Sequence, residues 1–208
     1  MEEITVWPAT GARVQFLRVE GLEAGDSLSA AESLKYAGFR VQKRRSEWLA
    51  GRLAAKTLLA AGGGKLSSFE ITTDPLGRPS CGPTLLSISH SGGWALAALK
   101  PGGTGFLGAD LEKIEERHPA WYRDYFHLSE LPKPDPSQAT RIWAMKEALL
   151  KALGLGLTAG PLDIRTDGEI RFSGRALERY KELGSPPFSV ETRPFPEGFW
   201  TVVAADKP

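Results

Sequence analysis

The stretch Phe106–Glu116, FLGADLEKIEE, opens the second half of the chain. Its apolar residues, bounded by small and charged ones, predict a strand. Residues i and i+2 of a strand point to the same face, so Asp110 and Glu112 should project together while Leu111 points into the core. Two adjacent carboxylates repel each other, and a bound Mg²⁺ would relieve that repulsion. A solvated acidic loop is the alternative, because the charges continue to Arg117.

The order of elements around this strand suggests two similar halves. Each half places helical segments first and antiparallel strands afterwards. We therefore expect an α+β fold in which two similar α/β lobes pack together, with residues 1–104 in the first and 105–208 in the second. The expected helices are 29–38, 41–64, 118–126 and 136–153; Ser29 and Glu32 form a capping-box pattern at the first, and Asp135 can cap the last. The expected strands and hairpins are 69–72, 84–100, 106–112, 162–172, 188–193 and 199–205, and the pattern leaves the state of 174–183 open. No repeat is visible at the level of residues, so internal duplication is a hypothesis.

Composition limits the classes of function. The chain has 208 residues, one cysteine and a formal net charge of +1. Near-neutral charge does not favour a nucleic acid partner. No apolar run approaches the ~18–20 residues that cross a bilayer. The acidic N-terminus lacks the pattern of a signal peptide, and a single cysteine fits a reducing compartment. We expect a cytoplasmic protein that acts on neither nucleic acid nor membranes.

A second charged segment lies in the helix expected over 136–153. In WAMKEALLK, residues 143–151, Glu147 and Lys151 are four positions apart and share a helix face. A surface ion pair is one explanation. However, the helix is apolar on most of its other sides, which indicates burial. Lys146, Glu147 and Lys151 would then lie at a partly covered rim, where an anionic ligand with its metal could partner them.

Two further segments could bind phosphate. Ser89 and His90 end a strand before two flexible glycines, where hydroxyl, imidazole and backbone N–H groups could cradle a phosphate. A structural histidine is the alternative, and no G-x-S-x-G elbow suggests a hydrolase. The helix over 41–64 is basic, and its Arg52 and Lys56 share a face that could bind a second phosphate or simply be solvated. Arg78 could add another cation.

These segments together resemble the 4'-phosphopantetheinyl transferases of the larger, pseudodimeric (surfactin-synthetase-activating) type. The family motifs G-x-D-x-E and W-x-x-K-E-x-x-x-K stand at residues 108–112 and 143–151, and the likeness extends over roughly residues 28–157. The resemblance implies a pseudodimer fold. It also implies that coenzyme A donates its phosphopantetheine arm to a serine of an apo acyl or peptidyl carrier protein, and that adenosine 3',5'-bisphosphate leaves.

The resemblance assigns roles to individual residues. Asp110, Glu112 and Glu147 would hold Mg²⁺, and Lys151 would contact the reacting phosphate. The remaining coenzyme A contacts would come from Arg52, Lys56, Arg78, Ser89, His90 and Lys146. Asp110, Glu147 and Lys151 would form the catalytic set, with Glu147 as the candidate base or, alternatively, only a ligand.

The carrier protein and the competing functions follow from the same reasoning. An acidic carrier helix, expected from the family, would suit Arg123 and the aromatic segment Trp121–Phe126, although these aromatics could equally be core residues. A duplicated chain can complete its site alone, so we expect a monomer. A Mg²⁺-dependent coenzyme A pyrophosphate hydrolase and a non-catalytic coenzyme A or carrier-binding module are the alternatives. The sequence does not identify the carrier.

Overall fold

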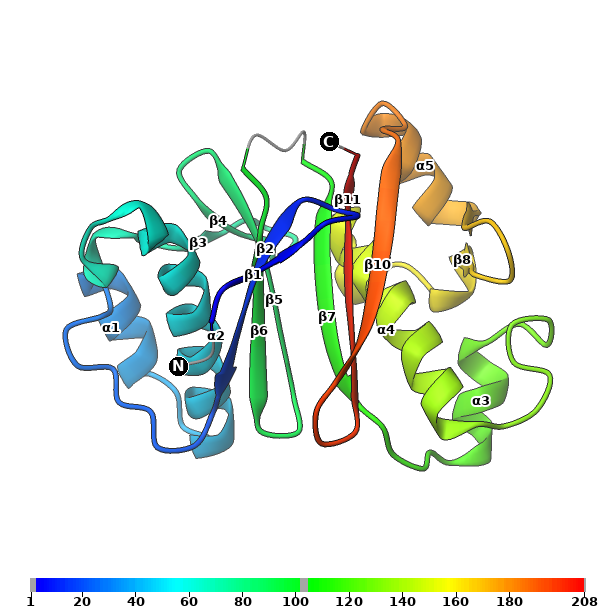
Figure 1. The fold of residues 1–208 in the computed structure, drawn as a ribbon, viewed down its shortest axis with the longest axis horizontal. Helices are drawn as coiled ribbons and strands as arrows, with labels where there is room; N and C mark the ends of the chain where they lie inside the picture. Colours follow the sequence, from blue (N-terminus) through cyan, green and yellow to red (C-terminus); the bar gives the residue numbers. More distant parts are fainter. Residues whose placement is uncertain (1–2, 102–104, 208) are drawn as a thin grey trace.

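The protein is built in four layers, seen from left to right in Figure 1: helices, a sheet, a second sheet, and helices again. The computed structural model describes residues 3–101 and 105–207. No helix in these two ranges is long and apolar enough to cross a membrane. The two sheets belong to different halves of the sequence, which confirms the expected fold of two α/β lobes. The boundary placed at residue 104 stays a prediction, since residues 102–104 lie outside the described ranges.

The first lobe contains a six-stranded sheet covered on one face by two helices. Its strands run in the order β1 (Thr5–Trp7), β2 (Ala12–Arg18), β6 (Trp94–Leu99), β5 (Thr84–Ser91), β4 (Pro79–Cys81) and β3 (Thr72–Thr73). Helix α1 (Ala30–Ala37) begins with the predicted capping box between Ser29 and Glu32. Helix α2 (Gln42–Leu59) packs its apolar residues against the sheet. Two short 3₁₀ turns, Ala60–Gly62 and Leu66–Ser68, follow α2.

The second lobe has a three-stranded sheet in the order β10 (Phe188–Phe195), β11 (Phe199–Asp206), β7 (Leu107–Lys113). Around it lie the helices α3 (Pro119–Tyr125), α4 (Pro136–Ala152) and α5 (Gly174–Glu182), the 3₁₀ turns Gly156–Thr158 and Pro161–Asp163, and the short hairpin of β8 (Ile164–Arg165) and β9 (Arg171–Phe172). The cap of α4 is as predicted, because the Asp135 carboxylate accepts the N–H of Gln138 at 2.6 Å.

The lobes share one topology of strand, two helices and two antiparallel strands. In both, the last strand lies between the other two: β2-β6-β5 in the first lobe and β7-β11-β10 in the second. The registers also correspond, since Arg18 pairs with Trp94 at one end of the first sheet and Lys113 pairs with Phe199 in the second. This correspondence supports internal duplication more directly than the order of elements could.

Both lobes also contain a buried glutamate that pairs with a buried lysine on the long helix. Lys56 Nζ lies 2.6 Å from Glu32, and Lys146 Nζ lies 2.7 Å from Glu130. Each glutamate accepts a backbone N–H from the residue three positions before it and another from a residue after the long helix: Ser29 and Ile71 for Glu32, His127 and Thr166 for Glu130. The repeat that the sequence does not reveal is therefore present as a pattern of contacts.

A hydrophobic core joins the lobes through the inner faces of the two sheets. Residues of β2 and β6, such as Val14 and Leu96, pack with residues of β7 and β11, such as Leu111 and Val203. Leu111 is fully buried there, as predicted. Because side chains alternate along a strand, Asp110 and Glu112 point away from this core, toward α4.

Candidate active site

The site lies at the free edge of β7, where that strand meets β5 of the first lobe and α4 of the second. Strand β11 occupies only one edge of β7. On the other edge, serine hydroxyls of β5 replace a strand ladder: Ser87 Oγ accepts the N–H of Ala109 at 2.8 Å, and Ser91 Oγ accepts that of Lys113 at 3.2 Å. The spacing of serines along β5 thus fixes the first lobe against the strand that carries the carboxylates.

Asp110 is the centre of the polar contacts. Its side chain is buried, and its Oδ1 accepts hydrogen bonds from Ser89 Oγ at 2.7 Å and Lys151 Nζ at 2.6 Å. Lys151 also donates to Ser89 Oγ and to the carbonyl of Ala109. The second oxygen, Asp110 Oδ2, is buried and has no hydrogen-bond partner among the described residues. Such an atom normally has a partner, so a ligand is expected there.

Glu112 and Glu147 both experience the charge of Asp110. Burial, followed by the Asp110 charge, raises the pKa of Glu112 to about 7, although Arg117 lies 3.7 Å away. The same two causes, in the same order, raise the pKa of Glu147, and its Oε1 is buried without a hydrogen-bond partner in the described residues. Three carboxylates thus share a region with too little positive charge to neutralise them.

The chemistry of these carboxylates fits a divalent cation, but the site is not preformed. Within residues 3–101 and 105–207, no three His, Cys, Asp or Glu side chains are arranged to hold a metal ion. The Lys151 ammonium instead lies against Asp110. Hard cations prefer oxygen ligands, and the unpaired oxygens of Asp110 and Glu147 are of that kind. Ligation by Asp110, Glu112 and Glu147 together stays a prediction that requires side chains to move.

Close packing of α4 on β7 positions the helical residues. A Cβ on Gly108 would overlap the carbonyl oxygen of Ala148 and lie 2.5 Å from the Ala152 nitrogen. Only glycine fits between this strand and this helix. The approach brings Glu147 and Lys151 to the face of β7 that carries Asp110, which gives the glycine of the G-x-D-x-E motif a steric role.

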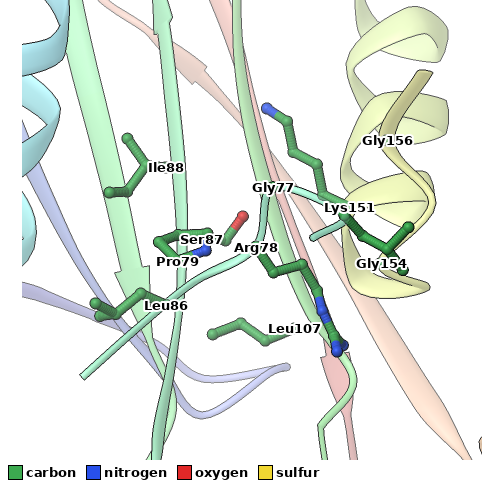
Figure 2. A pocket seen from close by; sticks show the side chains of 11 residues that line it. Gly77, Arg78, Pro79, Leu86, Ser87, Ile88, Leu107, Lys151, Gly154 and Gly156 are labelled. Atoms are coloured by element: carbon green, nitrogen blue, oxygen red, sulfur yellow. The ribbon is translucent and has the colours of Figure 1, made fainter. Parts of the chain in front are cut away.

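Two cavities adjoin the site, on either side of the turn at Gly77–Pro79. The first, shown in Figure 2, has a volume of about 190 Å³ and is lined by residues of both lobes, including Arg78, Ser87, Leu107, Lys151 and Gly154. The second, of about 260 Å³, is lined by Arg44, Glu47, Trp48, Arg52, Thr73, Gly77, Pro79, Ile88 and His90. Gly77, Pro79 and Ile88 line both cavities, so the two cavities are neighbours, and each has cationic side chains in its wall.

The predicted phosphate ligands are divided between these cavities. Ser89 faces Asp110, whereas His90 points the opposite way, into the second cavity, with Nδ1 at 3.7 Å from Glu47. Arg52 lines the same cavity with its guanidinium over the Trp48 ring, 5.1 Å from the ring centroid. Ser89 therefore belongs with the acidic centre, and His90 and Arg52 belong together at a distance from it.

Arg44 belongs to the basic helix and Trp48 to its apolar face, and neither was assigned a coenzyme A contact from the sequence, although both line the second cavity. Arg44 and Trp48 stand eight and four positions before Arg52, respectively, so all three share one face of α2. Helical spacing could have identified this face. The spacing alone does not show that the face is covered by the Gly77–Pro79 turn.

Lys56 does not lie where the resemblance placed it. Its side chain has no exposed surface and donates to Glu32 and to the carbonyl of Leu66, at 2.6 and 3.0 Å. Arg52, four positions earlier, also approaches Glu32, with Nε at 3.9 Å. Arg52 and Lys56 do share one face of α2, as predicted, but at Lys56 this face is covered by the buried carboxylate of Glu32. In this structure Lys56 is therefore not accessible to a coenzyme A phosphate, and its assignment as a phosphate ligand stays a prediction.

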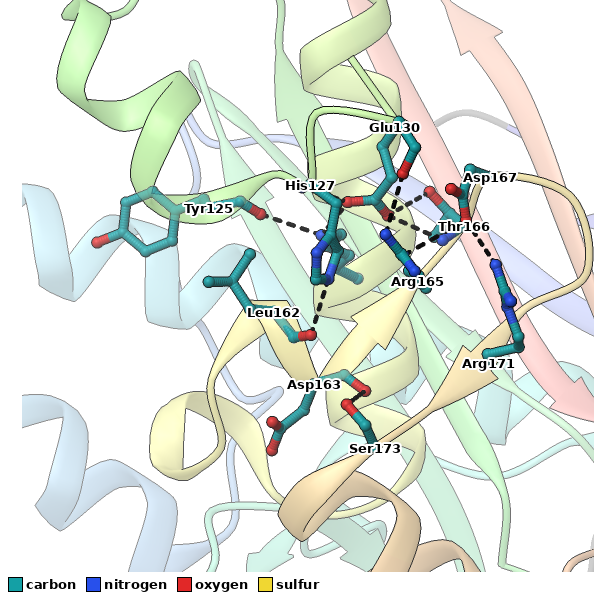
Figure 3. A network of polar contacts seen from close by, with 12 residues as sticks. Tyr125, His127, Glu130, Leu162, Asp163, Arg165, Thr166, Asp167, Arg171 and Ser173 are labelled. Atoms are coloured by element: carbon teal, nitrogen blue, oxygen red, sulfur yellow. Dashed lines mark hydrogen bonds and ion pairs between the residues drawn. The ribbon is translucent and has the colours of Figure 1, made fainter. Parts of the chain in front are cut away.

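Lys146 is likewise enclosed rather than at a rim. Figure 3 shows the polar network around Glu130, whose carboxylate accepts hydrogen bonds from Lys146 Nζ, the His127 N–H and both the N–H and hydroxyl of Thr166. Lys146 also donates to the carbonyl of Tyr125 at 3.0 Å. Burial lowers the pKa of Lys146, and its hydrogen bond to Glu130 opposes that shift. In this structure Lys146 is therefore not accessible to coenzyme A, so that contact stays a prediction, and Lys146 holds the segment after α3 against α4.

The aromatic segment after β7 is partly core. Phe126 is buried, and Trp121 and Tyr125 pack at its side and against Trp143 of α4. Arg123 is exposed and pairs with Asp124 at 2.8 Å. The rings support α4, while Arg123 remains accessible.

Two α/β lobes of one topology meet at an acidic centre, beside two cavities that have cationic side chains in their walls, an arrangement that suits a phosphate-containing ligand. Residues 106–191 match the 4'-phosphopantetheinyl transferase superfamily profile, and residues 36–100 match the 4'-phosphopantetheinyl transferase N-terminal domain. The chain therefore belongs to the 4'-phosphopantetheinyl transferases, and its N-terminal domain fits the larger, two-lobed type. No curated protein sequence matches the chain significantly.

Proposed function

We propose that this enzyme transfers the 4'-phosphopantetheine group of coenzyme A to a serine of an apo carrier protein. The products are the holo carrier protein and adenosine 3',5'-bisphosphate. The observation that carries the proposal is the meeting of both family motifs around Asp110: Lys151 donates to its carboxylate at 2.6 Å, and its charge raises the pKa of both Glu112 and Glu147. We further propose that the enzyme is a cytoplasmic monomer.

The cleft offers different environments for the parts of coenzyme A. We place the pyrophosphate beside Ser89 and Lys151, whose hydroxyl and ammonium lie 3.0 Å apart and could both donate to it. The nucleotide would extend past the Gly77–Pro79 turn toward Arg52 and His90. Arg78 lies at the wall of the first cavity, between these regions. Phosphate groups thus meet cations along the whole path.

The proposed reaction is displacement at the phosphorus that bears the pantetheine arm. The carrier serine Oγ forms a bond to this phosphorus, and the bond from phosphorus to the bridging oxygen breaks, releasing the bisphosphate. Glu147 accepts the serine proton, a role favoured by its unpaired oxygen and raised pKa. Lys151 stabilises the negative charge that develops on the phosphate oxygens. Mg²⁺, held by Asp110, Glu112 and Glu147, would neutralise charge on the pyrophosphate.

The carrier protein would dock beside α3. Arg123 is exposed there and can attract an acidic helix, while the packed aromatic rings give the surface a fixed shape. The segment directly follows the strand that carries Asp110 and Glu112, so a carrier bound on it would bring its serine near the acidic centre.

Mass spectrometry of apo carrier proteins incubated with coenzyme A and Mg²⁺ tests the proposal. We expect a phosphopantetheine mass gain on the carrier serine, dependent on Mg²⁺ and abolished by excess chelator. Release of the bisphosphate without carrier modification would instead indicate the pyrophosphate hydrolase, and binding of coenzyme A without either product would indicate a binding module. A panel of fatty acid, polyketide and nonribosomal peptide carriers identifies the partner.

A further inference from the structure

The side chain of Arg78, a residue of the first lobe, packs against the C-terminal end of α4 in the second lobe. A Cβ built on Gly154 would lie 2.9 Å from Arg78 Nε and 3.0 Å from its Cδ. Figure 2 shows the two residues side by side at the wall of the first cavity. Gly154 directly follows the helix cap at Leu153, so the guanidinium lies beside the carbonyl end of α4. The partial negative charge of a helix C-terminus attracts a cation.

Asp74 holds the same side chain from the other direction. Its Oδ2 accepts Arg78 Nε at 2.9 Å, and its Oδ1 accepts the backbone N–H groups of Leu76 and Arg78. The turn and the guanidinium are thereby locked together. The two terminal nitrogens of Arg78 make no hydrogen bond within the described part of the chain, so they remain available to a ligand in the cavity.

We propose that Gly154 is a positioning residue for coenzyme A binding. Because Gly154 has no side chain, the Arg78 side chain can pack directly against the end of α4. A methyl group at this position would lie 2.9–3.1 Å from Arg78 atoms, so the guanidinium would have to shift away from α4, which strains the bond between Arg78 Nε and Asp74. The terminal nitrogens would then leave the cavity wall that they share with Lys151. This inference rests on the proposed function, since coenzyme A is the ligand whose binding it concerns.

The chain contains a matched control for the backbone. Gly154 and Gly184 each follow a leucine at a helix end, and each donates its N–H to a lysine carbonyl at 2.9 Å, of Lys151 and Lys181 respectively. Their φ angles are +71° and +81°, so alanine is strained at both. A Cβ on Gly184, however, meets nothing within 4 Å. Gly184→Ala therefore reproduces the backbone strain without the clash.

The test compares Gly154→Ala, Gly184→Ala, Arg78→Ala and the double variant Arg78→Ala/Gly154→Ala. We expect Gly154→Ala to raise the KM for coenzyme A and its calorimetric Kd at least about fivefold, with Gly184→Ala within about twofold of the unaltered enzyme. Once Arg78 is alanine, Gly154→Ala should add nothing, as expected of coupled residues. Equal effects of the two glycine substitutions, or an additive double variant, would overturn the proposal.

A spectroscopic measurement separates this inference from the proposed function. The Nε–H signal of Arg78 in a ¹H–¹⁵N spectrum, assigned with Arg78→Lys, should shift in Gly154→Ala and remain in place in Gly184→Ala. An unmoved signal in Gly154→Ala would refute the claim that Gly154 positions the Arg78 side chain, even if the enzyme is an active transferase. Failure of the unaltered enzyme to modify any carrier would refute the proposed function, whatever the Arg78 signal does.

Discussion

Replacing Lys56 and Lys146 individually by methionine distinguishes buried structural lysines from coenzyme A ligands. Methionine fills a similar volume but leaves the partner carboxylate without its closest cation. Loss of one member of a buried pair typically costs about 3–5 kcal/mol of stability. Glu32 keeps Arg52 Nε at 3.9 Å, whereas Glu130 keeps only backbone and hydroxyl donors in the network described above. We therefore expect Lys56→Met at or below the lower end of this range and Lys146→Met nearer the upper end.

Activity should separate the two variants further. Lys146 immediately precedes Glu147, so freeing the segment after α3 should displace the candidate base and lower kcat about tenfold or more with little change in KM. Lys56→Met should leave both constants within about twofold. Urea unfolding gives the stabilities, and initial rates of carrier modification below the unfolding transition give the constants. A rise of about tenfold in the KM for coenzyme A in a fully folded Lys56→Met enzyme would refute the reasoning and restore Lys56 as a phosphate ligand.

Three other predictions concern the acidic centre. Asp110→Asn should reduce kcat/KM at least about 100-fold, measured by carrier modification, while the protein remains folded by circular dichroism; near-normal activity would contradict the central role of Asp110. Without metal, stability should fall as pH rises from about 4.5 to 7, by at most ~3 kcal/mol, because the folded protein keeps the Glu112 proton up to about pH 7 and the unfolded chain loses it near 4.5. Mg²⁺ should accordingly raise the melting temperature more at pH 8 than at pH 5.5, and an equal rise at both would exclude Glu112 as a ligand. Gly108→Ala should lower the melting temperature and kcat together, since α4 must move off β7; an unchanged kcat in folded protein would show that the close approach is not required.

Local signals in the sequence predicted much of the fold. The caps at Ser29 and Asp135 and the alternation around Leu111 depend on neighbours a few residues apart, and the structure confirms them. The segment 174–183 is uncertain from the sequence and forms α5, and the strand expected at 69–72 is reduced to Thr72–Thr73. These differences occur where packing outweighs local preference.

The site was harder to predict because it depends on partners distant in the chain. Helical spacing correctly put Lys56 with Arg52 and Lys151 with Glu147, but spacing cannot reveal what faces a lysine. Glu32 and Glu130, which enclose Lys56 and Lys146, come from earlier segments and carry no local signal of that role.

The hydrophobic core shared by the two sheets restricts how substrates can enter. Two lobes with a small, polar contact could move apart as rigid bodies when a substrate binds. Separating the two lobes of this protein would instead expose the core residues Val14, Leu96, Leu111 and Val203 to water. We therefore expect the cleft between the halves to keep a nearly constant width. Admission of a long, flexible molecule must depend on smaller adjustments at its rim, such as the turn that carries Arg78, and bulky extensions of that molecule must point outward to be tolerated.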